Sequence, residues 1–175
     1  MDDNIVSTPK FVAFVIAFAM LAALLVLYND GFIPIIYYAN VAFHEAGHFI
    51  FEVFGEPMGL YGGTLGQLLP PIICAVVFWR QQSLVSLSVA LLWLFENFFM
   101  AAGYIETARS EGPIVWGVLG WYGHHDWWVI LRRWGVLQYD TTIATIVRIV
   151  GWMGLFSTLV YITYFWWQCK KFYAK

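Results

Sequence analysis

Long apolar stretches with few charges constrain this chain more than any other feature of its sequence. Residues 11–28 are 18 consecutive positions without a charged side chain, and residues 83–107 and 142–167 are nearly as apolar. A helix needs about 20 mostly apolar residues to cross the hydrocarbon core of a bilayer. Hydrophobic residues make up 61% of the chain and charged residues only 11%, far from the composition of soluble domains. The sequence therefore predicts an integral membrane protein built of helices.

Two further segments, residues 32–54 and residues 57–80, are also long enough to span. The fold class predicted is an all-α membrane bundle of about five transmembrane segments, in a single domain of residues 1–175. The segment at residues 57–80 begins with a glycine-rich half, so it is either one helix or a broken or re-entrant entry followed by a helix from Leu68. A membrane-surface loop, with an amphipathic turn at residues 127–134, is expected between the fourth and fifth segments.

Charge narrows the partners that the chain can have. The net charge is -2, and no run of lysine or arginine is present that could follow a phosphate backbone, so nucleic acid is not an expected partner. The lipid bilayer is the expected one. Lysine and arginine are equally frequent on the two sides of a five-helix arrangement, so both membrane orientations stay open, as does the oligomeric state.

The second segment carries the sequence HEAGH at positions 44–48. His44 and His48 are four residues apart, so on a helix they project from one face, as two ligands of one tetrahedral zinc ion must. Glu45 then lies beside the metal, where it can take a proton from a water molecule that zinc activates. If the helix begins near residue 32, His44 lies about 18 Å along it, close to the middle of a hydrocarbon core ~30 Å thick.

A catalytic zinc site needs a third protein ligand, and the fourth position is left for water. We expect Asp126 of the sequence GHHD, with His125 or Glu96 as alternatives. The GHHD segment can instead be an interfacial loop beside tryptophans. Glu96 has its own alternatives, either a protonated carboxyl hydrogen-bonded between helices or a partner of Arg148.

HEAGH in a transmembrane helix, followed by a glycine-containing stretch and a distant aspartate, resembles the site-2 protease family of intramembrane zinc metalloproteases. The resemblance implies zinc at His44 and His48 and a catalytic role for Glu45. The third ligand of that family is an aspartate in an Asn-Pro…Asp-Gly type motif on a later helix. No such motif occurs in the later segments of this chain, so only the first motif transfers.

A wider set of motifs is similar to a group of small bacterial membrane proteins with zinc-protease-like sequences. The motifs lie between positions 44 and 140 and read HEAGHFIF, GGTLGQLLPP, ENFFMAAGYIETAR and GHHDWWVILRRWGVLQYD. This second resemblance implies location in the bacterial inner (cytoplasmic) membrane.

These patterns favour a membrane-embedded zinc metalloendopeptidase that hydrolyses transmembrane or membrane-proximal peptides, with Glu45 as the general base. Asn40, Gln67 and Asn97 are candidates for holding the substrate or its oxyanion. Two alternatives stay open. One is a non-proteolytic zinc-dependent membrane hydrolase, which would lack an extended edge for a peptide. The other is a catalytically inactive zinc-binding protein, whose metal would be closed by four protein ligands.

Overall fold

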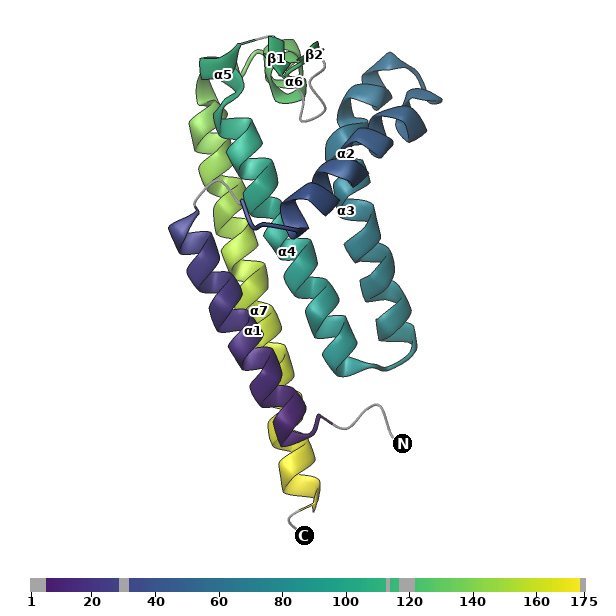
Figure 1. Cartoon of the computed structure of the whole chain (residues 1–175), viewed down its shortest axis with the longest axis vertical. Coiled ribbons are helices and arrows are strands. Elements are labelled where there is room, and N and C mark those ends of the chain that lie inside the picture. Colours follow the sequence, from purple (N-terminus) through teal and green to yellow (C-terminus); the bar gives the residue numbers. More distant parts are fainter. Residues whose placement is uncertain (1–5, 29–31, 113, 117–121, 174–175) are drawn as a thin grey trace.

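Helices make up nearly all of the chain, and one short β-ribbon interrupts them (Figure 1). The computed structural model describes residues 6–28, 32–112, 114–116 and 122–173. In chain order, the elements are α1 (Thr8–Leu27), α2 (Ile36–Glu52), α3 (Glu56–Arg80), α4 (Leu84–Glu106), α5 (Ala108–Glu111), β1 (Ile114–Trp116), β2 (Tyr122–His124), α6 (Asp126–Arg133), the 3-10 turn η1 (Leu137–Tyr139) and α7 (Asp140–Tyr173). The structure thus confirms a helical bundle.

The helices α1, α4 and α7 run side by side and enclose the main apolar core (Figure 1). The α4 and α7 helices pack closely because small residues of α7 face large rings of α4: a Cβ atom on Gly154 would lie 2.1 Å from the Phe95 ring. Fully buried apolar side chains of this core are Leu25, Phe99, Leu155 and Ile162.

The α2 and α3 helices form an antiparallel hairpin beside α4, joined by a turn at Gly55. Gly55 has φ of 103°, a left-handed conformation that glycine adopts without strain. The two helices touch through glycine: a Cβ on Gly47 would lie 2.1 Å from the carbonyl oxygen of Gly62, and one on Gly66 would lie 2.4 Å from that of Phe43. Small residues at such contacts let helix backbones approach closely.

The α3 helix is continuous from Glu56 to Arg80, so it is not the broken helix that the glycine-rich sequence left open. Packing against α2 stabilises the glycine-rich half of this helix. Helix propensities do not include such contacts between helices. Pro70 and Pro71 lie inside the helix, where each removes one backbone donor, and neighbouring groups in a bundle tolerate this loss.

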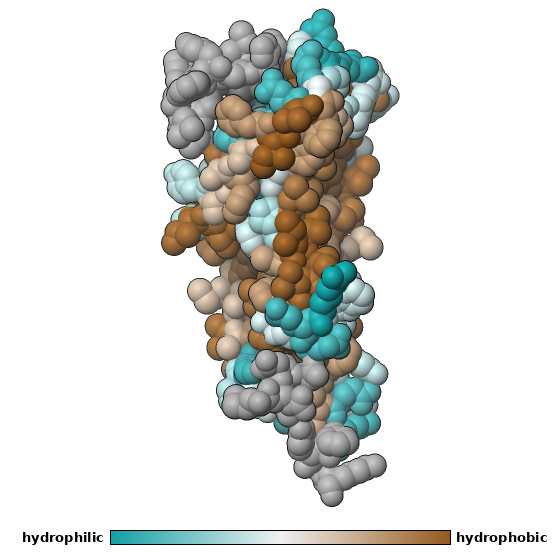
Figure 2. Space-filling model, turned by 90° about the vertical axis from the view of Figure 1, so that its right-hand side faces the viewer, coloured by the Kyte–Doolittle hydropathy of each residue, from teal (hydrophilic) through white to brown (hydrophobic). Residues whose placement is uncertain are grey.

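Four helical segments of the described chain are long and apolar enough to cross a membrane: Thr8–Leu27, Glu56–Arg80, Leu84–Glu111 and Leu137–Lys171. The α2 helix, predicted to be a further span, has 17 residues and is about 25 Å long at 1.5 Å per residue. The count of five spans stays a prediction. Figure 2 shows apolar side chains over the middle of one face, with hydrophilic residues toward its ends.

The segment between α4 and α7 is more structured than the predicted surface loop. The strands β1 and β2 pair antiparallel, with Ile114 opposite His124 and Trp116 opposite Tyr122. The predicted amphipathic turn at residues 127–134 corresponds to α6, which buries Ile130 and Leu131 and packs Leu131 against the ends of α4 and α7. The all-α prediction did not include this ribbon. A strand of three residues is too short to show the alternation of apolar and polar residues that predicts a strand.

Candidate metal centre

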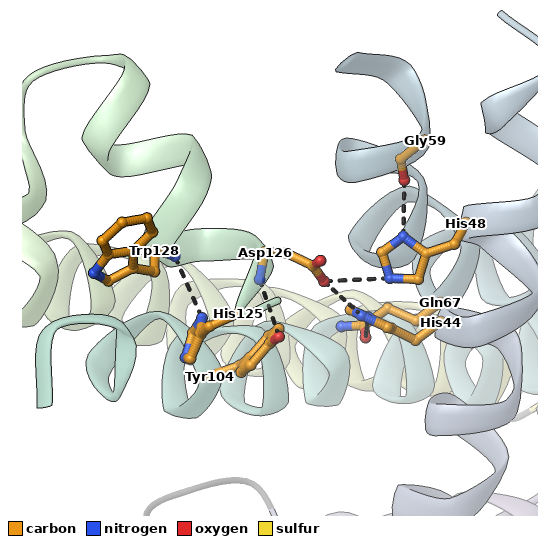
Figure 3. Close-up of polar contacts among 8 residues, drawn as sticks. All are labelled: His44, His48, Gly59, Gln67, Tyr104, His125, Asp126 and Trp128. Atoms are coloured by element: carbon orange, nitrogen blue, oxygen red, sulfur yellow. Dashed lines mark hydrogen bonds and ion pairs between the residues drawn. The ribbon is translucent and has the colours of Figure 1, made fainter. Parts of the chain in front are cut away.

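Three side chains from two distant parts of the chain converge beside the α2–α3 hairpin (Figure 3). They are His44 and His48 of α2 and Asp126, the first residue of α6, and their ligand atoms lie within 4.8 Å of one another. Asp126 Oδ2 is 3.0 Å from His44 Nε2 and 3.3 Å from His48 Nε2. The structure therefore brings both histidines of the HEAGH motif to the aspartate expected as the third ligand.

Residues of α3 fix the Nδ1 atoms of both imidazole rings. His48 Nδ1 lies 2.8 Å from the carbonyl oxygen of Gly59, and His44 Nδ1 lies 3.2 Å from Gln67 Oε1. A carbonyl oxygen accepts, so each Nδ1 donates its hydrogen and the lone pair of a neutral ring is on Nε2. When both rings are neutral, two such nitrogens and a carboxylate oxygen face one another, and these three atoms could hold a metal ion.

Gly63 leaves room for the two imidazoles. A Cβ atom on Gly63 would stand 2.4 Å from His44 Nε2 and 2.6 Å from His48 Nε2. A side chain at this position would therefore displace both rings, and glycine lets them lie side by side against α3. Two imidazoles and one carboxylate form a donor set that fits a metal ion.

One face of α3 makes this arrangement. Gly59, Gly63 and Gln67 follow one another at intervals of four residues, so they lie in one row along the helix. The outer two carry the acceptors for the imidazoles, and the middle one leaves the space between them. The side chain of Gln67, which the sequence suggested as a substrate or oxyanion group, contacts His44 Nδ1.

The charge on Asp126 is stabilised by its neighbours. Burial raises the pKa of the Asp126 carboxyl, but the His44 and His48 imidazoles outweigh this effect and hold the pKa below its usual range. The backbone N–H of Asp126 donates to the hydroxyl oxygen of Tyr104 over 3.2 Å. An ionised, positioned carboxylate is the form that binds a metal ion.

Glu45 lies on α2 next to His44 and is half-buried. It interacts electrostatically with His48 and with Tyr104, so its carboxylate is close to the cluster. Within the described part of the chain, no hydrogen bond joins its carboxylate to another residue. Its oxygens are therefore available to a water molecule.

Tyr104 of α4 was not expected from the sequence. Its ring lies edge-on to the His44 ring, with centroids 5.8 Å apart, and stacks on the His125 ring at 4.2 Å. Its hydroxyl oxygen accepts from the Asp126 backbone, which leaves the hydroxyl hydrogen free to be donated. Nothing in the pattern distinguishes this residue from the other nine tyrosines of the chain, because its role depends on α4 lying against α2 and α6.

His125, the alternative third metal ligand predicted from the sequence, lies outside the cluster (Figure 3). Its ring is fully buried, Nδ1 accepts from the backbone N–H of Trp128 at 3.3 Å, and Nε2 lies 3.1 Å from Thr107 Oγ1. It caps the N-terminus of α6, and burial lowers the pKa of its imidazole. With both nitrogens engaged, His125 is not part of the cluster.

Glu96, Asn40 and Asn97 also lie outside the cluster. Asn40 Nδ2 donates to Glu96 Oε2 over 2.9 Å, and Asn97 Nδ2 lies 3.4 Å from Asn40 Oδ1. Arg148, the alternative partner of Glu96, forms an ion pair with Glu106. The three residues form a separate buried group between α2 and α4.

The cluster is open on the side of His48. The His48 side chain is 27% exposed, whereas those of His44 and Asp126 are 11% and 9% exposed. His48 is therefore the most accessible of the three side chains.

No protein-family model matches this sequence, and neither a curated protein nor a solved structure matches it. The similarity to site-2 proteases stays a prediction that rests on the motif at positions 44–48.

Proposed function

We propose that this chain is a membrane-embedded zinc metalloendopeptidase that hydrolyses peptide bonds in transmembrane or membrane-proximal substrates. The observation that carries the proposal is the convergence of His44, His48 and Asp126 next to Glu45, in a bundle with four membrane-length apolar helices. Ionisable groups in such a bundle are costly, and they mark functional sites by default.

Zinc is the metal that this donor set suits best. Two imidazoles and one carboxylate form a catalytic set with one open position. When bound, zinc supplies Lewis acidity, which brings the pKa of a water ligand to about 7 and polarises a carbonyl group.

Residues of the chain transfer the proton that the attacking water molecule releases. Glu45 accepts a proton from the attacking water molecule and passes it to the amine nitrogen as the C–N bond breaks, so the proton is returned within one cycle. Tyr104, whose ring lies edge-on to that of His44 and whose hydroxyl accepts from the Asp126 backbone, is the donor we assign to the developing oxyanion. Asn40 and Asn97 are engaged in their own buried group, and Gln67 in orienting His44.

An apolar peptide fits the surroundings of the site. Phe49, which follows His48 on α2, is exposed, and so are Val53 and Phe54 in the turn after the helix. The strand β2 ends two residues before Asp126 and pairs only with β1 in the described sheet, and its second edge is the one we assign to pairing with an extended peptide. A hydrolase of lipid esters has no use for such an edge, which favours a peptidase.

An inactive, structural zinc site is the less favoured alternative. Such a site is closed by four protein ligands. The nearest candidate for a fourth is His125, whose two nitrogens already contact Trp128 and Thr107. The free carboxylate of Glu45 likewise has no role in a structural site.

The test uses the purified full-length protein in detergent with zinc, and a set of synthetic single-helix transmembrane peptides whose products are identified by mass spectrometry. Glu45→Gln should keep its zinc and lose at least about 100-fold in cleavage rate, since it removes the general base. Glu52→Gln is the matched control, an exposed acid on the same helix, and should cleave as the wild type does. Undiminished cleavage by Glu45→Gln contradicts the mechanism, and turnover of lipid esters without any peptide cleavage favours the other hydrolase.

A further inference from the structure

A second buried polar cluster lies apart from the metal centre and takes no part in the proposed reaction. It consists of Asn40 of α2 and of Trp93, Glu96 and Asn97 of α4. The side chains of Asn40, Glu96 and Asn97 are all 0% exposed. Polar groups at such depth are tolerated when each is hydrogen-bonded, and a charge only when it is also paired.

The Asn40 amide holds this cluster together. Its nitrogen donates to Glu96 Oε2 at 2.9 Å, and its oxygen accepts from Trp93 Nε1 at 2.9 Å and from Asn97 Nδ2 at 3.4 Å. Asn97 Nδ2 also donates to the carbonyl oxygen of Trp93 over 3.0 Å. The hydrogen-bond donors of the cluster thus go to the Asn40 oxygen, to a backbone carbonyl and to one oxygen of Glu96.

Two oxygens are left over. Among the described residues, Glu96 Oε1 and Asn97 Oδ1 are buried side-chain oxygens without a hydrogen-bond partner. They belong to adjacent residues whose side chains both contact Asn40. Both oxygens are acceptors, and leaving two buried acceptors unpaired is expensive.

Among the described residues, no counter-charge compensates an ionised Glu96. It forms no ion pair with any of them, and the polar side chain that acts on it is Asn40. Arg148 of α7 is in an ion pair with Glu106. An ionised carboxylate would therefore stand in an apolar interior with a single hydrogen bond.

We propose that Glu96, Asn97 and Asn40 form a buried proton-binding site. Glu96 is a neutral carboxylic acid, and the proton on Oε1 is donated to Asn97 Oδ1, directly or through one water molecule. One proton removes the buried charge and satisfies both leftover oxygens, while Oε2 continues to accept from Asn40.

The bound proton also has a structural consequence. Asn40 precedes His44 by one helical turn on α2, so the cluster ties α4 to the helix that carries two metal ligands. Loss of the proton would place a charge between the two helices and weaken that tie. The inference does not depend on the proposed peptidase activity.

Infrared spectroscopy of the purified full-length protein at neutral pH tests the proposal. The wild type should show the carbonyl band of a protonated carboxyl group, and Glu96→Gln should lack it. Glu106→Gln is the matched control, on the same helix but ion-paired with Arg148, and should keep the band. Asn97→Leu removes the acceptor and should shift the frequency of the band, whereas an unshifted band contradicts the assignment of Asn97.

Thermal unfolding gives a second, independent readout. A glutamine at position 96 can accept from Asn40 and donate to Asn97, as the neutral acid does, so Glu96→Gln should unfold at or above the wild-type temperature. Glu96→Leu should unfold below it, because Asn40 loses its acceptor. If the wild type has no protonated band and sodium raises the unfolding temperature of the wild type but not of Glu96→Gln, the site holds a metal cation and the proposal is wrong.

Discussion

Asp126 Oδ2 lies 3.0 Å from His44 Nε2, although 82 positions of the sequence separate the two residues. The contact joins the first turn of α6 to the middle of α2, and α3 supplies acceptors for both imidazoles from its glycine-rich face. Three separate elements therefore share one candidate metal centre, and each can be tested by a different substitution.

A substitution of Gly63 tests the packing of the two imidazoles against α3. Gly63→Ala places a methyl group 2.4–2.6 Å from both imidazole nitrogens, so we expect zinc affinity to fall by about 10- to 100-fold although no ligand is changed. Competition with a fluorescent zinc chelator measures the change. Thr64→Ala, on the neighbouring face of α3, should bind zinc as the wild type does. Full affinity in Gly63→Ala would contradict the close packing of the two ligand rings against α3.

Gln67 tests the orientation of His44. Gln67→Leu removes the acceptor for His44 Nδ1, and the loss of such a partner lowers metal affinity by about 10- to 100-fold. Gln67→Glu keeps an acceptor of nearly the same shape and should retain zinc. The same chelator competition compares the two variants. Equal affinities in both variants would contradict the assigned contact.

Tyr104 tests the oxyanion donor. Tyr104→Phe keeps the ring that lies against His44 and His125 but removes the hydroxyl, so zinc content should be unchanged. If the hydroxyl stabilises the transition state, kcat should fall by about 100-fold or more with little change in KM. Steady-state kinetics on a cleaved peptide measure both constants. Tyr164→Phe, an exposed tyrosine of α7, is the control and should leave kcat unchanged.

His125 tests whether the site is open. Asparagine is a good N-cap residue, so His125→Asn should preserve the start of α6 and the zinc content. The variant loses the contact with Thr107 and the stacking on Tyr104, which should cost about 1–2 kcal/mol of folding free energy. Elemental analysis and thermal unfolding give the two values. Loss of zinc from this variant would make His125 a ligand and the site a closed one.

Much of the architecture followed from local patterns. Apolar length predicted a helix at residues 83–107, and α4 runs from Leu84 to Glu106. The four-residue spacing of His44 and His48 placed both rings on one face of a helix, because that spacing is a property of helical geometry alone. The amphipathic turn at residues 127–134 was foreseen on the same basis.

Features that depend on packing between segments were not predictable. The register of α2 on α3 places Gly63 and Gln67 against the imidazoles, and no local pattern encodes that register. Gln67 and Asn40 were both considered as substrate groups, since their chemistry suits that role, but their partners come from other helices. Tyr104 acquires its position only when α4 meets α6.

The metal content of the purified wild type, measured beside His44→Ala and Asp126→Ala, tests the central claim most directly. The account predicts about one zinc ion per chain in the wild type and loss of the ion in both variants, because each removes one of three ligands. A folded wild type without zinc, or an Asp126→Ala variant that retains it, would contradict the metal centre described above.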